Sequence, residues 1–91
     1  MKVSDYGNML EQVVGKKCLD YQEFGSYQGE WVAILDNNDS VELWTGYYGS
    51  CSGCDWLERE RNWDSDEVDD KKAREFFKED KPFVEIPESI L

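Results

Sequence analysis

The first apolar pattern along the chain has the spacing of a helix. Within residues 4–15 the apolar side chains fall on one helical face: Tyr6, Met9, Leu10, Val13 and Val14. Ser4 suits an N-cap, Asp5 suits the positive end of the helix dipole, and Gly15 suits the position after the last turn. We therefore expect an amphipathic helix with one face in the core.

The next three segments have the patterns of strands. Short-period alternation over residues 17–27 is typical of a half-buried strand. Residues 30–36 form an almost continuous apolar run, which is typical of a central strand covered on both faces. A turn rich in Asp and Asn follows, and residues 41–48 then form a third strand with one face made of Val41, Leu43, Thr45 and Tyr47. The pattern predicts a three-stranded antiparallel meander over residues 17–48.

Two helices are expected after the meander. Asp55 and Glu58 have the spacing of a capping box, so a helix should begin there and run to about residue 63. The run Asp64-Ser65-Asp66-Glu67 repeats this signature, and a second helix should extend from it to about residue 79, before Lys81-Pro82. Residues 83–91 should form a short extended tail that Pro87 interrupts.

These elements predict one small acidic α+β domain over residues 1–91. It has an N-terminal helix, a three-stranded antiparallel meander, two C-terminal helices and the extended tail. The residues expected to be mainly buried are Trp31, Ile34, Leu35, Leu43, Trp44, Phe76 and Phe77.

The composition is dominated by negative charge. Twenty-one Asp and Glu oppose ten Lys and Arg, which gives a net charge of −11. Such a field repels nucleic acid and anionic membranes and favours cationic partners, although solubility alone would also explain it. The sequence has no apolar run long enough to span a membrane and no signal-peptide core. The odd count of three cysteines fits no fully paired disulfide framework, so we expect a cytoplasmic protein.

The chain contains no histidine, which removes the commonest general base and the commonest metal ligand. Catalysis would have to depend on carboxylates or a lone cysteine, and no pair of such residues has a spacing that suggests acid–base chemistry. The sequence therefore predicts a protein that is not an enzyme.

The loop between the meander and the next helix carries Cys51-x-x-Cys54, followed by Asp55. Three interpretations are open: a zinc site completed by Cys18 or by a second chain, a redox pair with a thiolate at the helix start, and a tight structural corner. We predict the structural corner, with both thiols near one another at the helix entrance, and no metal or cofactor.

The run from Tyr48 to Asp55, Tyr-Gly-Ser-Cys-Ser-Gly-Cys-Asp, resembles a group of small uncharacterised phage and prokaryotic proteins. Gly-Glu-Trp-Val-Ala-Ile-Leu before it and Pro-Phe-Val-Glu-Ile-Pro after it extend the likeness over residues 27–87. The resemblance implies a viral or mobile-element setting, which would be the host cytoplasm. It brings no catalytic residues with it.

Residues 55–80 hold eleven acids and six bases, and a dense acidic cluster lies within them: Asp64, Asp66, Glu67, Asp69 and Asp70. Proteins that bind nucleic acid recognise rows of phosphates through Lys and Arg, so a row of carboxylates on a helix can occupy the same groove. Small acidic phage proteins of this kind inhibit restriction, CRISPR effectors and uracil-DNA glycosylase, and Glu88-Ser89-Ile90 is similar to a segment of one glycosylase inhibitor.

The hypothesis is therefore a DNA mimic that inhibits a basic nucleic-acid-binding host protein, with these five residues as the contact. The alternative is a structural or interaction module with a CxxC corner that is able to bind metal. The sequence leaves the oligomeric state open.

Overall fold

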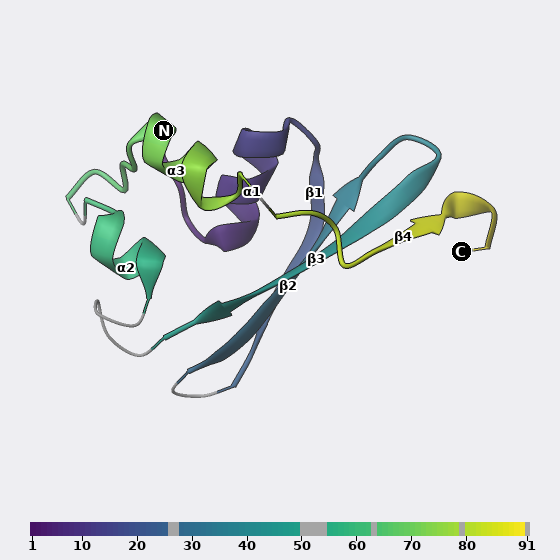
Figure 1. Ribbon diagram of the computed structural model, residues 1–91, viewed down its shortest axis with the longest axis horizontal. Coiled ribbons are helices and arrows are strands. Elements are labelled where there is room, and N and C mark those ends of the chain that lie inside the picture. Colours follow the sequence, from purple (N-terminus) through teal and green to yellow (C-terminus); the bar gives the residue numbers. More distant parts are fainter. Residues whose placement is uncertain (26–27, 50–54, 63, 79, 91) are drawn as a thin grey trace.

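The protein is built on one four-stranded antiparallel sheet with helices on one side of it (Figure 1). The computed structural model describes residues 1–25, 28–49, 55–62, 64–78 and 80–90. In chain order the elements are α1 (Tyr6–Val14), β1 (Cys18–Phe24), β2 (Gly29–Asp36), β3 (Ser40–Tyr48), α2 (Trp56–Glu60), α3 (Asp70–Phe76), β4 (Val84–Pro87) and the 3-10 helix η1 (Glu88–Ile90). The sheet has the strand order β1-β2-β3-β4.

The α+β class is confirmed, but the predicted three-stranded sheet is wrong. The segment expected to be an extended tail is the fourth strand, β4, which pairs antiparallel with β3 from Ser40↔Pro87 to Leu43↔Val84. Pro87 does not prevent this pairing, because an edge strand can direct a missing N–H away from the ladder. The antiparallel pairing predicted between residues 30–36 and 41–48 is confirmed, with Ala33 opposite Trp44.

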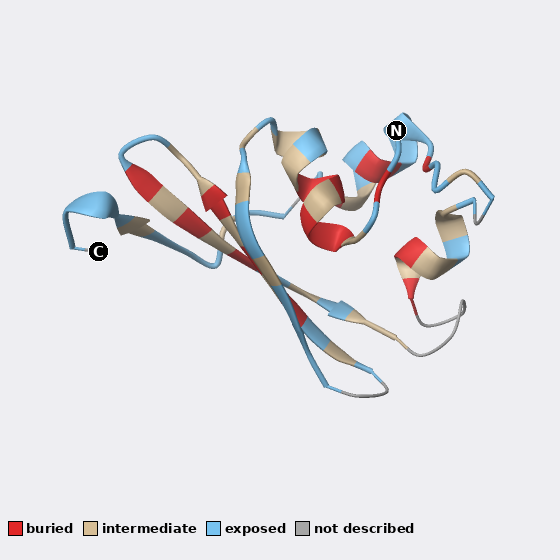
Figure 2. Ribbon diagram, turned by 180° about the vertical axis from the view of Figure 1, so that it is seen from behind, coloured by how far each residue is buried: buried red, intermediate tan, exposed pale blue. Residues whose placement is uncertain are grey.

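The core lies between the helices and one face of the sheet (Figure 2). Trp31, Ala33 and Leu35 of β2 are buried on that face, whereas Val32 and Ile34 alternate to the other face and are only half-buried. The expectation that β2 is covered on both faces is therefore wrong. Burial is confirmed for Trp31, Leu35, Trp44 and Phe77 but not for Ile34, Leu43 or Phe76, which are half-buried.

Helix α1 forms where the apolar spacing predicts it. Asp5, rather than the expected Ser4, is the N-cap, and its Oδ1 accepts a hydrogen bond from the Asn8 N–H at 2.7 Å. Gly15 ends the helix in the left-handed conformation, with φ of 74°. Gly7 lets the helix approach β1, because a Cβ at this position would lie 2.5 Å from Cδ1 of Tyr21.

The two later helices are shorter than predicted. Helix α2 ends at Glu60, and α3 begins at Asp70 rather than near residue 64. Residues 64–66 instead form a turn with Asp66 at φ of 58°, and the Asp66 N–H donates to the Asn62 carbonyl at 2.7 Å. The next residues pair with the start of the chain: Val3 N–H donates to Asp66 O, and Val68 N–H donates to Met1 O. Backbone groups that a helix would need are therefore used by a distant segment.

One carboxylate is buried under the helices. The Glu42 side chain is 5% exposed and lies 2.7 Å from the ammonium of Lys16, which is 33% exposed. The Trp44 Nε1–H donates to Glu42 Oε1 at 3.2 Å. Because Lys16 follows α1 and Glu42 lies in β3, this ion pair ties the end of the helix to the middle of the sheet.

No helix in the part of the chain that the structure describes is long and apolar enough to cross a membrane.

We predict that Lys16→Met lowers the free energy of unfolding by about 1–3 kcal/mol, because it leaves the buried Glu42 carboxylate without a counter-charge. Urea denaturation measures the loss. The matched control is Lys17→Met at the neighbouring exposed position, which should change stability by less than about 0.5 kcal/mol. Equal losses in the two variants would show that the Lys16–Glu42 ion pair does not stabilise the fold. The double variant Lys16→Met/Glu42→Gln should recover part of the stability, since no unpaired charge is then buried at this position.

Candidate functional site

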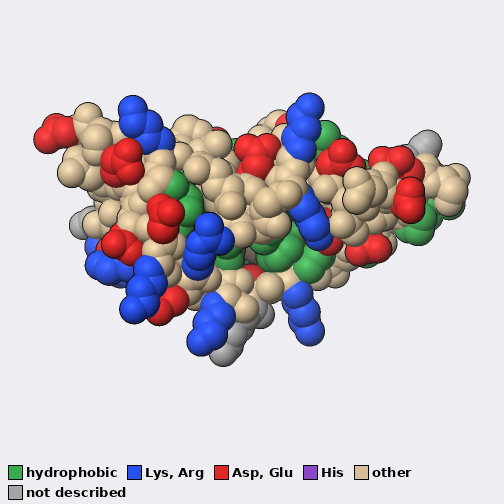
Figure 3. Space-filling model, turned by 90° about the horizontal axis from the view of Figure 1, so that it is seen from above, with side chains coloured by type: hydrophobic (Ala, Val, Ile, Leu, Met, Phe, Trp, Pro, Cys, Tyr) green, Lys and Arg blue, Asp and Glu red, His purple; other side chains and the backbone are tan. Residues whose placement is uncertain are grey.

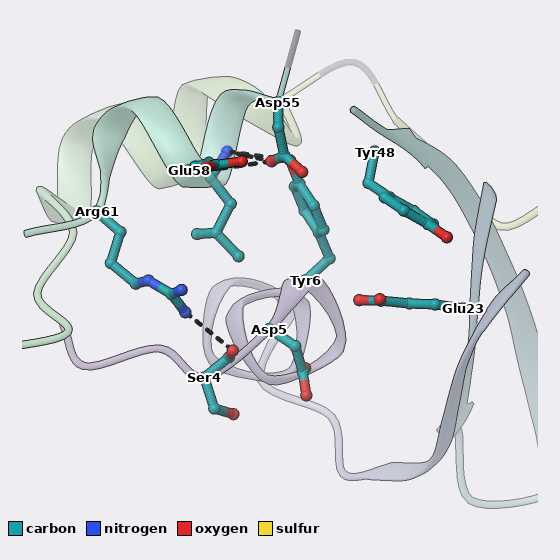
Figure 4. A pocket seen from close by; sticks show the side chains of 9 residues that line it. Ser4, Asp5, Tyr6, Glu23, Tyr48, Asp55, Glu58 and Arg61 are labelled. Carbon is teal, nitrogen blue, oxygen red and sulfur yellow. Dashed lines mark hydrogen bonds between the residues drawn. The ribbon is translucent and has the colours of Figure 1, made fainter. Parts of the chain in front are cut away.

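The side chains of Asp55 and Tyr6 meet at the start of α2 (Figure 4). Asp55 is the N-cap of α2, as the sequence predicts, and its Oδ1 accepts from the N–H groups of Leu57 at 3.0 Å and Glu58 at 3.2 Å. The Tyr6 hydroxyl also donates to Oδ1, and it accepts from the Leu57 N–H at 3.0 Å. Oδ2 accepts from the Gly49 N–H, at the end of β3, at 3.2 Å.

This buried carboxylate is fully engaged in holding three segments together. Burial and the adjacent Asp55 carboxylate raise the pKa of the Tyr6 hydroxyl far above its usual value, so the phenol stays protonated and keeps donating. A group locked in this way is suited to structure rather than to proton transfer. The arrangement is a polar joint between α1, β3 and α2.

A cavity of about 150 Å³ lies beside the joint, with Asp5, Glu23 and Glu58 on its walls. Figure 4 shows Arg61 on the opposite side from Glu23. The Arg61 guanidinium donates to the Ser4 carbonyl at 3.0 Å. The Glu23 carboxylate accepts from the Tyr21 hydroxyl at 2.7 Å. The cavity is small and its walls are occupied by internal hydrogen bonds.

The predicted thiol site falls mostly outside the described residues. Cys51 and Cys54 are both outside them, so the hypotheses of a zinc site, a redox pair and a structural corner stay untested. Cys18 is half-buried in β1, and burial raises the pKa of its thiol, which disfavours the thiolate. Among the residues that the structure describes, no three Cys, Asp or Glu side chains are placed to hold a metal ion.

The predicted acidic cluster extends from the turn after α2 to the first residue of α3, and three of its five members have internal partners. Asp69 is the N-cap of α3, where its side chain accepts from the Lys72 N–H at 3.1 Å. Asp70 and Glu67 lie 2.7 and 3.3 Å from the α-amino group of Met1, and the hydrogen bond from this group lowers the pKa of the Asp70 carboxyl. Asp64 and Asp66 are exposed in the preceding turn. Part of the cluster's charge is therefore neutralised within the molecule.

Charge is unevenly divided between the two layers of the fold. The four strands carry six carboxylates, Asp20, Glu23, Glu30, Asp36, Glu42 and Glu85, and contain no Lys or Arg. All ten basic residues therefore lie outside the four strands. Seen from above, Lys and Arg side chains are interspersed with Asp and Glu (Figure 3). The positive charge of the molecule is absent from its sheet.

The side of the sheet away from the helices carries a row of apolar side chains. Strand alternation and register place on this open face Phe24, Val32, Ile34, Val41, Leu43, Tyr47, Val84 and Ile86. Phe24 is 58% exposed, Tyr47 is 77% exposed and Val84 is 40% exposed. The same register places Asp20, Glu30 and Asp36 on this face, opposite Ile34, Tyr47 and Val41 in turn.

Sequence reasoning grouped Val41, Leu43, Thr45 and Tyr47 on one face correctly, but it did not foresee that this face is the uncovered one. The alternation of β3 could have shown this, because Glu42 and Trp44 lie on the opposite face of the strand from those four residues and are buried in the core. A charged residue at a core-facing position concealed the pattern, because its partner Lys16 is distant in sequence.

Comparisons of the chain with protein-family models, with curated proteins and with solved structures gave no match. The resemblance of residues 48–55 to small phage and prokaryotic proteins therefore stays an expectation from the sequence.

We predict that Tyr6→Phe lowers the free energy of unfolding by about 1.5–3 kcal/mol, because it removes the hydroxyl that donates to the buried Asp55. The matched control is Tyr21→Phe, which removes an exposed hydrogen bond to Glu23 and should cost less than about 1 kcal/mol. Chemical denaturation followed by tryptophan fluorescence measures both. A loss from Tyr6→Phe no larger than that of the control would contradict the structural role of the joint.

Proposed function

We propose that this protein is a binding protein rather than an enzyme, and that it associates with a basic nucleic-acid-binding protein and keeps it from nucleic acid. The observation that carries the proposal is the open face, an apolar surface whose strands contain carboxylates and no Lys or Arg. Such a face is complementary to a partner surface in which apolar residues are surrounded by Lys and Arg.

The open face has the composition of an interface centre. Interfaces are enriched in aromatic residues at the core and depleted in Lys, and a few buried anchors supply most of the binding energy. Phe24 and Tyr47 are exposed aromatic side chains on this face, and Val32, Ile34 and Leu43 fill the surface between them and β4. Apolar surface of this kind gains about 25 cal/mol for each Å² removed from water.

The charges favour a basic partner over a second copy of this chain. Two copies joined through the open face would bring the face that carries Asp20, Glu30 and Asp36 against an equally acidic face, and each copy has a net charge of −11. Like charges placed opposite one another oppose such an interface. Nucleic acid itself is repelled by the same field. Proteins that bind nucleic acid carry patches of Lys and Arg that neutralise phosphates, so a nucleic-acid-binding protein is a partner with the complementary charge.

The acidic cluster at residues 64–70 is a second candidate contact for the same partner. Its free members are Asp64 and Asp66, since Glu67, Asp69 and Asp70 have internal partners. We therefore assign the main contact to the open face and a weaker one to the cluster. The resemblance of residues 48–55 implies a viral or mobile-element setting, and small acidic phage proteins inhibit restriction, CRISPR effectors and uracil-DNA glycosylase. The partner we propose is therefore a host protein involved in defence or repair.

To test this function, a partner is captured from a host lysate and purified, and its dissociation constant is measured by titration calorimetry. Phe24→Ala/Val84→Ala, at two exposed positions on the open face, should weaken binding at least about tenfold, because exposed anchors carry the apolar contact. The fold should persist, since neither side chain is in the core.

Charge variants separate the open face from the cluster. Asp20→Asn/Glu30→Gln should weaken binding at low salt and reduce its salt dependence, because both carboxylates lie on the open face. The matched pair Asp64→Asn/Asp66→Asn removes the same charge elsewhere and should have the smaller effect. Adding the protein should also displace DNA or RNA from the partner. If nucleic acid stays bound beside the protein, the proposed function is wrong. If the open-face variants bind like the unaltered chain, the assignment of the main contact to the open face is wrong.

A further inference from the structure

Strand β4 covers only the first half of the neighbouring edge of β3. The pairing ends at Leu43↔Val84, whereas β3 continues to Tyr48 (Figure 1). The Leu43 carbonyl accepts from the Phe83 N–H at 2.7 Å, so the main chain of Leu43 faces β4. Along a β-strand the main-chain N–H and C=O groups of successive residues point to opposite edges. Those of Trp44 and Gly46 point toward β2, and those of Thr45 and Tyr47 point to the other edge, beyond the end of the pairing with β4. No described residue pairs with Thr45 or Tyr47 on that side.

An aromatic cavity of about 430 Å³ lies at this free stretch of β3. Its walls are Tyr6, Trp31, Trp56 and Phe76, with Thr45, Gly46 and Tyr47 on the strand side and Asp80 as its carboxylate. The walls are held in pairs, because Tyr6 stacks on Trp31 at 5.6 Å between ring centroids and Trp56 stacks on Phe76 at 4.6 Å. The cavity is thus a preformed space beside main-chain groups of β3 that no described residue pairs with.

Gly46 contributes to the shape of this cavity. A Cβ at this position would lie 2.5 Å from the Trp31 ring, so the absence of a side chain lets the indole lie against the strand. The Trp31 Nε1 lies against Gly46, is buried, and has no hydrogen-bond partner among the described residues. A buried donor without an acceptor is costly, so the close packing of the indole on the strand is retained at the expense of a hydrogen bond.

We propose that an extended peptide segment of the partner adds to β3 as a strand beside Thr45 and Tyr47, in line with β4, and places an arginine side chain in the aromatic cavity. Main-chain hydrogen bonds to a free strand edge supply affinity without sequence preference, and the pocket for an alternate side chain supplies the specificity. A guanidinium stacks on aromatic faces and pairs with a carboxylate, which Asp80 provides. The inference rests on the proposed function only in taking the segment from a basic protein.

The test uses synthetic nine-residue peptides with blocked ends, alternating Thr and Val, and a central Arg. The Arg peptide should bind, shift the NMR signals of the Thr45 and Tyr47 amides and the Trp31 indole, and slow hydrogen exchange at the two amides. A central Glu should weaken binding at least about tenfold through repulsion by Asp80, and N-methylation of the amides that face β3 should abolish binding. Binding that survives N-methylation, or signal changes confined to the open face, overturns the proposal.

Two variants of the protein complete the design. Asp80→Asn should weaken the Arg peptide about three- to tenfold, whereas the matched change Asp64→Asn at a remote exposed carboxylate should leave it unchanged. Phe24→Ala/Val84→Ala should also leave the peptide unchanged, since neither residue lines the cavity. Partner binding without peptide binding overturns this inference and leaves the proposed function intact. Peptide binding without loss of partner binding in the open-face variants overturns only the docking through the open face.

Discussion

The structure depends on the burial of Trp31 in the central strand. This side chain is 2% exposed, stacks on Tyr6 of α1, contacts Phe77 edge-on after α3, and lies against Gly46 of β3. Tyr6 in turn holds Asp55, which caps α2. Helices α1, α2 and α3 are therefore positioned through one indole or through the ring stacked on it. Large aromatic side chains bury much surface in a small chain, and this arrangement gives a 91-residue domain a core without a disulfide among its described residues.

Concentrating the core on one side has a consequence for the other. A sheet has two faces, and one short helical layer covers only one of them. The apolar residues that alternate away from Trp31, namely Val32 and Ile34, are then left on the open face together with Leu43. Exposed apolar patches of this kind usually mark interaction surfaces in natural proteins. The free half of β3 has a related origin, because β4 is only four residues long and cannot cover a nine-residue strand.

Sequence patterns correctly predicted the elements that depend on residues close together in the chain. The helical stripe of α1, its Gly15 end and the β2–β3 pair follow from spacing and turn residues within a few positions. The predictions were wrong where pairing with a segment distant in sequence determines the local structure. Residues 66–68 pair with residues 1–3 instead of starting α3, and β4 joins a strand about 40 residues earlier. The cavity was also missed, although Gly46 inside an apolar strand is a recognised sign that another group approaches the backbone closely.

The negative charge has two explanations, solubility and partner binding, and the distribution of charge connects them. An exposed apolar face and a free strand edge both invite self-association, and a net charge of −11 opposes it. If solubility were the only constraint, carboxylates and bases could be mixed over every surface, as they are on the helical side. Instead the strands exclude Lys and Arg entirely. The same carboxylates that keep two copies apart would attract a basic partner, so a single charge pattern selects against self-pairing and for the partner.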